Sequence, residues 1–264
     1  MKYYKTFRKE CKAMEYNHRT EGMSELETMV NKNNIVYRER WSPICVSCFE
    51  NPLKEGNIGL SSAEAKNIAY SLQYLQFVQL ELNELHLHNI VEQQLWKTYI
   101  ITAMAIIECI FNSIVKKNGK QLINEWSDGI ELDTNEIVQN DITKKCKVIM
   151  YEKLQTPIDV EMKFFQLIDI VEKKRLISFR TKGYEDLRTL KNIRNRIHLS
   201  ASEMNDTDYY KIEKGHYLLS RRYLYFVITN EKLYSSPQTS FDFIKLSEKE
   251  NKEADAYLKK MEEN

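Results

Sequence analysis

WKTYIITAMAIIECIFNSIVKK, the stretch Trp96–Lys117, decides the fold class. Its apolar residues recur at intervals of three and four, the spacing of one face of an α-helix. This face carries Trp96, Ile100, Ala103, Ile107, Phe111 and Ile114. The Asn118-Gly119 pair that follows is a typical helix stop. We therefore expect the most apolar helix of a mainly α-helical protein to lie here.

The sequence on either side predicts further helices. Ser61 followed by Glu64 is typical of a helix start, with a serine cap and an acid in the first turn. With only 7 glycines and 4 prolines in 264 residues, the chain has few helix breakers. Apart from the central stretch, helices are expected from Ser61 to about Leu95, over Glu161–Lys174, Tyr184–Leu199 and Asp208–Thr229, and in the charged tail from Ser247, unless that tail is frayed.

The domain organisation follows from these segments. Residues 1–60 read as an irregular N-terminal extension, residues 61–240 as a helical bundle with its core at about 95–230, and residues 241–264 as a charged tail. Gln121–Val160 is mixed, and Lys147–Tyr151 fits either a short strand or part of a helix. Pro157 is expected to end the element before it. The fold class predicted is an antiparallel helical bundle with a short β insertion as an option.

Composition narrows the partners and the compartment. The net charge of +1 comes from 39 basic and 38 acidic residues, so any contact with a nucleic acid has to come from a local patch. The N-terminus lacks the apolar segment of a signal peptide, and we expect no stretch to reach the roughly 20 apolar residues of a membrane span. We expect a cytoplasmic protein without membrane contact. Cys45 and Cys48 form a single CxxC without a second ligand pair, so no metal or cofactor is expected.

One helix turn carries groups suited to phosphate chemistry. Arg194 and His198 are four residues apart, which stacks them on one side of a helix at the margin of its apolar stripe, with Lys191 beside them. Arg196 lies roughly 160° around the helix from both. Histidine exchanges protons near neutral pH, and arginine offers a fixed fork of donors to phosphate oxygens. This pair could therefore cut RNA through its own 2′-hydroxyl without a metal.

Glu108 is the acid embedded in the apolar stretch. At about 100° per residue it falls on the edge of the apolar stripe. It is therefore either a boundary carboxylate paired with a neighbouring base or a polar group that points into a cleft.

The run Leu190–His198, LKNIRNRIH, resembles the signature of the HEPN (higher eukaryotes and prokaryotes nucleotide-binding) superfamily. That signature is an Arg, commonly followed by Asn, His or Asp, with a His about one helical turn downstream. The apolar helix with Glu108, the Phe164–Ile168 segment and the helix after the motif also resemble the family's core helices. The likeness covers roughly Leu95–Asn230. The family usually has four to six residues between Arg and His, whereas this chain has three.

The resemblance implies a four- to five-helix antiparallel bundle that forms homodimers, with two motifs meeting in one RNA-cutting cleft. Many members are metal-independent endoribonucleases of toxin–antitoxin, abortive-infection or antiviral defence systems. By position, Arg194 would contact phosphate, Asn195 would orient the site and His198 would handle the proton, with Glu108 and Lys191 in support. An antitoxin or another regulatory protein is the implied partner besides RNA.

Two other interpretations remain open at this point. The chain is either such an endoribonuclease, a non-catalytic HEPN-like bundle that binds RNA, a nucleotide or a protein, or an unrelated helical scaffold. Arginines interleaved with tyrosines favour contact with single-stranded RNA, or alternatively an amphipathic helix whose tyrosines pack. The candidate RNA-binding residues are Arg188, Arg221 and Arg222.

Overall fold

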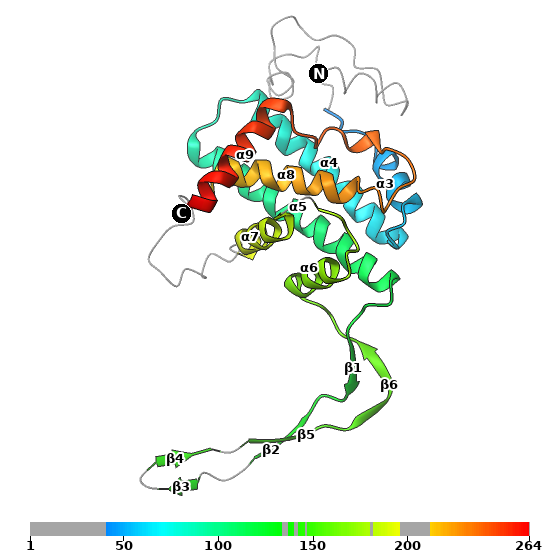
Figure 1. Ribbon diagram of the computed structural model, residues 1–264, viewed down its shortest axis with the longest axis vertical. Coiled ribbons are helices and arrows are strands. Elements are labelled where there is room, and N and C mark those ends of the chain that lie inside the picture. The colour runs from blue at the N-terminus through cyan, green and yellow to red at the C-terminus, as the bar shows by residue number, and fades with distance from the viewer. Residues whose placement is uncertain are drawn as a thin grey trace, which may run out of the picture. The chain divides into compact units, whose positions relative to one another are not determined.

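The computed structural model describes residues 41–133, 137–139, 142–145, 147–179, 182–195 and 212–263. The chain divides into two compact units, each described here by itself. The helical unit comes from the ranges Met1–Asn118 and Phe164–Asn264, and the hairpin arm is Gly119–Lys163. The protein is mainly α-helical, as the sequence predicts (Figure 1).

The described part of the helical unit begins with two helices, one inside the range that was expected to be irregular and one just after it. Helix α3 spans Val46–Glu55 and packs on α4, which spans Ser62–Glu84. The predicted start of α4 is confirmed, because the Ser61 hydroxyl accepts a hydrogen bond from Glu64 N at 3.2 Å. The Glu64 carboxylate accepts one in return from Ser61 N at 2.7 Å. This reciprocal pair satisfies two of the free backbone donors at the helix start.

Helix α5, Asn89–Lys117, is the central helix of this unit and contacts α4, α6, α7 and α8. Ile100, Ala103, Ile107 and Phe111 are fully buried, as the periodicity predicts. The helix starts earlier than expected, at Asn89, because the chain breaks after α4 and His88 caps α5. By length and composition alone, α5 is apolar enough to cross a membrane, contrary to the expectation that no stretch is. Within its most apolar 18 residues, 61% are buried inside the protein.

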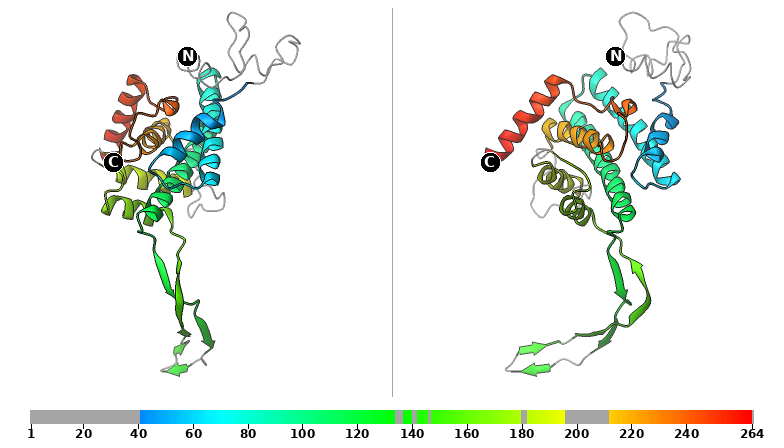
Figure 2. Two further views of the ribbon diagram at one scale, coloured as in Figure 1. Left: turned by 90° about the vertical axis from the view of Figure 1, so that its right-hand side faces the viewer. Right: turned by 45° about the vertical axis from the view of Figure 1, so that its right-hand side comes forward.

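Three of the remaining helices contact α5, and a 3-10 turn and a last helix follow them in the chain. They are α6 (Phe164–Lys173), α7 (Gly183–Asn195), α8 (Lys214–Ile228), the 3-10 turn η3 (Thr239–Phe241) and α9 (Glu248–Glu263). The α5 and α8 helices meet at Tyr99 and Tyr217, whose rings lie edge to face at 5.0 Å. The charged tail is thus a helix, and α9 packs against α8 at an angle (Figure 2).

The hairpin arm is one long antiparallel ribbon inserted between α5 and α6. Its strands are β1 (Ile123–Trp126), β2 (Ile130–Asp133), β3 (Ile137–Gln139), β4 (Ile142–Lys144), β5 (Lys147–Met150) and β6 (Lys153–Asp159). The first strand pairs with the last and so on toward the middle of the segment: β1 with β6, β2 with β5, and β3 with β4. At the base, Val160 N donates to Leu122 O at 2.8 Å, so the two ends of the arm lie side by side.

The strands of the arm bear on two predictions from the sequence. Lys147–Met150 is a strand, which resolves the alternative between strand and helix. The expectation that Pro157 ends its element is wrong, because β6 continues to Asp159. A proline is tolerated there because β6 pairs on one side only, so its missing N–H can fall on the free edge.

Candidate functional site

The site forms where the end of α7 meets the middle of α5. Leu187, Leu190 and Ile193 are buried and fix the rotation of α7. This rotation aims Arg194 at α5, where its Nη2 donates to Glu108 Oε2 at 2.6 Å. The Arg194 side chain keeps 34% of its surface exposed and the Glu108 side chain 25%. Glu108 is therefore a boundary carboxylate paired with a base, and the base comes from another helix.

Asn195 and Lys191 share this end of α7. The Asn195 amide oxygen lies 3.4 Å from Arg194 Nη1, at the long limit of a hydrogen bond. Lys191 is partly exposed, and its ammonium lies 5.9 Å from the centre of the Phe165 ring on α6. Phe165 is 45% exposed although its neighbour Phe164 is buried. The structure thus gathers two cations, an amide and an open aromatic ring at one place.

Cys109, next to Glu108 on α5, is a free thiol. Burial, together with the nearby Glu64 and Glu108 carboxylates, raises its pKa to about 11. A thiol with this pKa stays protonated at neutral pH, and the thiolate is the nucleophilic form. Cys109 is therefore unsuited to act as a nucleophile beside the Arg194–Glu108 pair.

Arg188 lies on the same helix but faces α6. Its guanidinium pairs with Asp169 at 2.7 Å and also with Glu172, and these hydrogen bonds raise the pKa of Arg188. The two acids are three residues apart on α6, so they present one face to it. Arg188 thus joins α7 to α6, while Arg194 joins α7 to α5.

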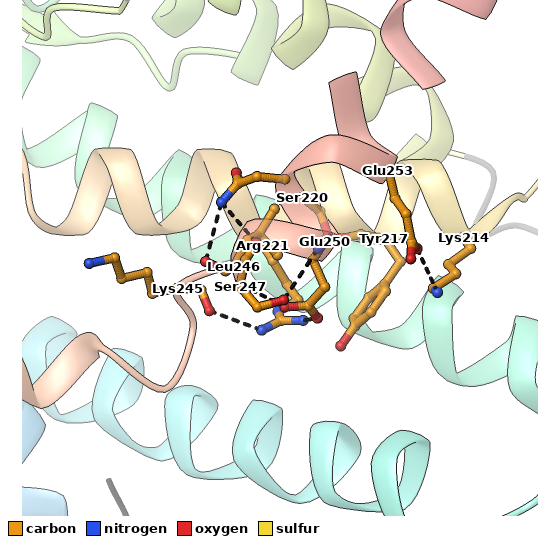
Figure 3. A network of polar contacts seen from close by, with 10 residues as sticks. Lys214, Tyr217, Ser220, Arg221, Lys245, Leu246, Ser247, Glu250 and Glu253 are labelled. Carbon is orange, nitrogen blue, oxygen red and sulfur yellow. Dashed lines mark hydrogen bonds and ion pairs between the residues drawn. The ribbon is translucent and has the colours of Figure 1, made fainter. Parts of the chain in front are cut away.

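Arg221 lies inside the helical unit, in the polar network drawn in Figure 3. Only 5% of the residue is exposed, and its guanidinium pairs with Glu250 of α9 and donates to Lys245 O at 3.3 Å. The Gln79 side-chain amide lies 2.7 Å from Nε, and with its oxygen turned toward the guanidinium it accepts a hydrogen bond there. The guanidinium also lies 5.5 Å from the centre of the Tyr217 ring. Arg221 is thus a core residue that ties α8 to α4 and α9.

Arg222 also reaches α9. It pairs with Asp255 at 2.7 Å and donates to Asn251 O at 2.8 Å. Near the start of α8, the Tyr257 ring of α9 packs so closely on Gly215 that a Cβ there would fall 2.1 Å from it. A side chain at position 215 would therefore push α9 away. The contacts of Arg221 and Arg222 are with protein groups of their own chain.

Sequence reasoning missed the acidic partners of these arginines, and Phe165 as an exposed ring. The spacing of Asp169 and Glu172 on one helix face was an available signal for the Arg188 contact. No comparable local signal pairs Glu250 or Asp255 with α8, because a charged tail also reads as a solvated surface.

Of the predicted site residues, the structure brings together Arg194, Asn195, Glu108 and Lys191, and it places Arg188, Arg221 and Arg222 elsewhere. His198 and Arg196 lie outside the described residues. Among the residues that the structure describes, no group of three or more His, Cys, Asp or Glu is arranged to hold a metal ion.

Comparison with protein-family models finds no matching family, and comparison with curated proteins and with solved structures finds no significant match to either.

Proposed function

We propose that this chain is a HEPN-like endoribonuclease of toxin or phage-defence type, with Arg194, Asn195 and His198 as its catalytic residues. The observation that carries the proposal is the Arg194–Glu108 pair, which holds a partly exposed guanidinium at the end of α7. An arginine has five N–H donors, and Glu108 and Asn195 engage only part of this fork. The remaining donors are available to the oxygens of a phosphodiester.

The reaction that fits these groups is transesterification by the RNA's own 2′-hydroxyl. The His198 imidazole takes the 2′-hydroxyl proton while the 2′-oxygen attacks phosphorus. The bond from phosphorus to the 5′-oxygen breaks, and the imidazolium of His198 returns the proton to that oxygen, which leaves as a 5′-hydroxyl. Arg194 stabilises the negative charge that builds on the phosphoryl oxygens. The products are a 2′,3′-cyclic phosphate and a 5′-hydroxyl, and the reaction needs no metal ion.

The path of the RNA follows from the same end of α7. Lys191 supplies a second positive charge one turn before Arg194, and the exposed Phe165 ring beside it offers a stacking surface for a base. We propose this path in place of one along Arg188, Arg221 and Arg222, whose guanidinium groups are held by acids of the same chain. As in the family it resembles, two copies would share one cleft, and a regulatory protein would cover it.

The test is cleavage of end-labelled RNA by the purified full chain in the presence of EDTA. Arg194→Ala and His198→Ala should each lower the rate at least about 100-fold, the lower end for loss of acid–base or charge-stabilising groups. Arg196→Ala is the matched control, because the helical spacing of the sequence predicts that Arg196 points away from Arg194 and His198. Helical circular dichroism should stay unchanged in all three.

Three outcomes would remove the proposal. They are no cleavage by the wild-type chain, equal loss in all three variants, or products that carry 3′-hydroxyl ends. The tight spacing of three residues between Arg194 and His198 favours one alternative, a non-catalytic bundle that binds RNA. That alternative predicts RNA binding that weakens in Arg194→Ala and no strand breakage.

A further inference from the structure

Helix α9 is joined to α8 mainly by charged side chains. Three acids of α9 each meet one base of α8, in the pairs Glu250–Arg221, Glu253–Lys214 and Asp255–Arg222. The first two pairs are drawn in Figure 3. Asn251 adds its backbone and side-chain oxygens as acceptors for Arg222, and the Lys260–Glu213 pair has the opposite polarity. The surface that α8 offers to α9 is therefore predominantly basic.

The apolar contribution to this contact is small. Of the α9 side chains that the structure describes, Ala254 is buried and the others are partly or fully exposed. Ion pairs that water reaches contribute little to stability. A segment with few buried apolar contacts opens at a lower cost in free energy than the whole fold. We therefore expect α9 to come away from α8 while the other helices stay folded.

The place that Glu250 occupies is built to receive a carboxylate. Its partner Arg221 is only 5% exposed, and the Gln79 amide and the Tyr217 ring hold the same guanidinium. The Tyr99 hydroxyl is completely buried without a hydrogen-bond partner in the described part of the chain, and the charges of Arg221 and Glu250 act on it. A buried guanidinium that loses its anion is strongly destabilising. This site therefore requires a carboxylate, whichever chain supplies it.

Gly215 fits the same surface to a helix that carries an aromatic ring. A Cβ at position 215 would lie 2.1 Å from the Tyr257 ring of α9. Glycine is a poor helix former, yet it stands in the first turn of α8 and leaves room for this ring. Glu250, Ala254 and Tyr257 lie on one side of α9, because they are separated by four and three residues. The surface thus accepts an acid, a small residue four positions later and an aromatic residue three positions after that.

We propose that α9 is an exchangeable occupant of this surface, and that the surface binds an acidic helix of a different protein in its place. Charge complementarity with Lys214, Arg221 and Arg222 selects an acidic helix. Exchange with a second copy would replace each contact by an identical one and gain nothing. A different protein gains when its helix buries a larger apolar side chain than Ala254, which offsets the high effective concentration of the tethered α9. This inference stands independently of RNA cleavage.

The first test uses α9 itself as the probe. A fluorescent peptide with the sequence of residues 247–263 is titrated with the full chain, and its binding is followed by polarisation. Glu250→Lys/Asp255→Lys in the full chain should release the tethered α9, so that the peptide binds this variant at least about 10-fold more tightly than it binds wild type. The matched control is Glu248→Lys/Glu263→Lys, the same change of charge at exposed positions of α9, which should bind the peptide as weakly as wild type does.

A second measurement uses the wild-type chain alone. Hydrogen exchange should be faster in α9 than in α5, and raising the salt from about 0.1 M to 1 M, which screens exposed charges, should speed it in α9 only. Equal protection of the two helices at both salt concentrations overturns the proposal. So does a Glu250→Lys/Asp255→Lys chain that leaves the peptide unbound, or one that binds single-stranded RNA in place of the peptide. A wild-type chain with the mass of two copies joined through α9 overturns the choice of a different protein.

Discussion

The helical unit and the hairpin arm contain equally apolar side chains but place them in opposite environments. In the helical unit Ile107 and Phe111 are completely buried, whereas in the arm Ile130 and Ile142 are each 59% exposed. Apolar burial is the main favourable contribution to folding. The comparison teaches that the helical unit supplies the stability of the single chain, while the apolar residues of the arm contribute only when something else covers them.

The largest difference in the free energy of unfolding is expected when the same substitution, isoleucine to alanine, is made in each of the two regions. Ile107→Ala should lower the free energy of unfolding by about 2–5 kcal/mol, because it leaves a cavity in the core. Ile130→Ala, the same chemical change in the arm, should stay within about 0.5 kcal/mol, as for exposed sites. Chemical denaturation followed by helical circular dichroism, at a concentration low enough to keep the chain monomeric, measures both. Equal effects would erase the distinction between the regions.

The Arg221–Glu250 ion pair is a polar contact within the same helical unit. Arg221→Met removes the charge that faces Glu250 and should cost about 2–3 kcal/mol, somewhat less than for a fully buried pair because the Glu250 side chain is 27% exposed. Arg222→Met is the adjacent control. Its partner Asp255 is 62% exposed, so about 1 kcal/mol or less is expected. Thermal unfolding compares the two, and a larger loss in Arg222→Met would contradict the burial argument.

The smallest effect is a pH dependence. Burial alone would raise the pKa of Glu250, but Arg221 and the Ser247 hydrogen bonds outweigh it and hold that pKa below the usual 4.5. A lowered folded pKa means that the pair stabilises the fold above about pH 4.5 and that this stability is lost as the pH falls through the folded pKa. Wild type should therefore lose more stability than Glu250→Gln between pH 5 and about pH 3. Parallel pH curves for the two would disprove the assignment.

Much of the helical unit could be predicted because its signals are local. The Ser61–Glu64 capping pair and the apolar stripe of α5 are each contained within a few turns of sequence, and both are confirmed. The start of α5 was not predicted, because His88 is not one of the common cap residues and neither Gly nor Pro marks the break. The Arg194–Glu108 contact was anticipated only loosely, as one of two interpretations of Glu108.

What could not be predicted depends on contacts between distant segments. The strand at Lys147–Met150 is recognisable only through its partner Ile130–Asp133, and the sequence alone left it ambiguous with a helix. The burial of Arg221 depends on Glu250, which lies 29 residues further along the chain in a tail that looked solvated. In both cases the pattern of apolar or charged residues within one segment does not specify which distant segment packs against it.

The closed base of the hairpin has an evolutionary consequence. Since Gln121 and Leu122 are hydrogen-bonded to Val160 where the ribbon begins, its length can change without any shift of α5 or α6. Deletions or insertions in descendants of this gene should occur as matched pairs, one residue from each strand. A residue gained or lost in one strand alone would slip the pairing of the strands beyond it by one position, so that side chains of the two strands would no longer lie opposite their present partners. Homologous proteins are therefore expected to differ in this segment by even numbers of residues.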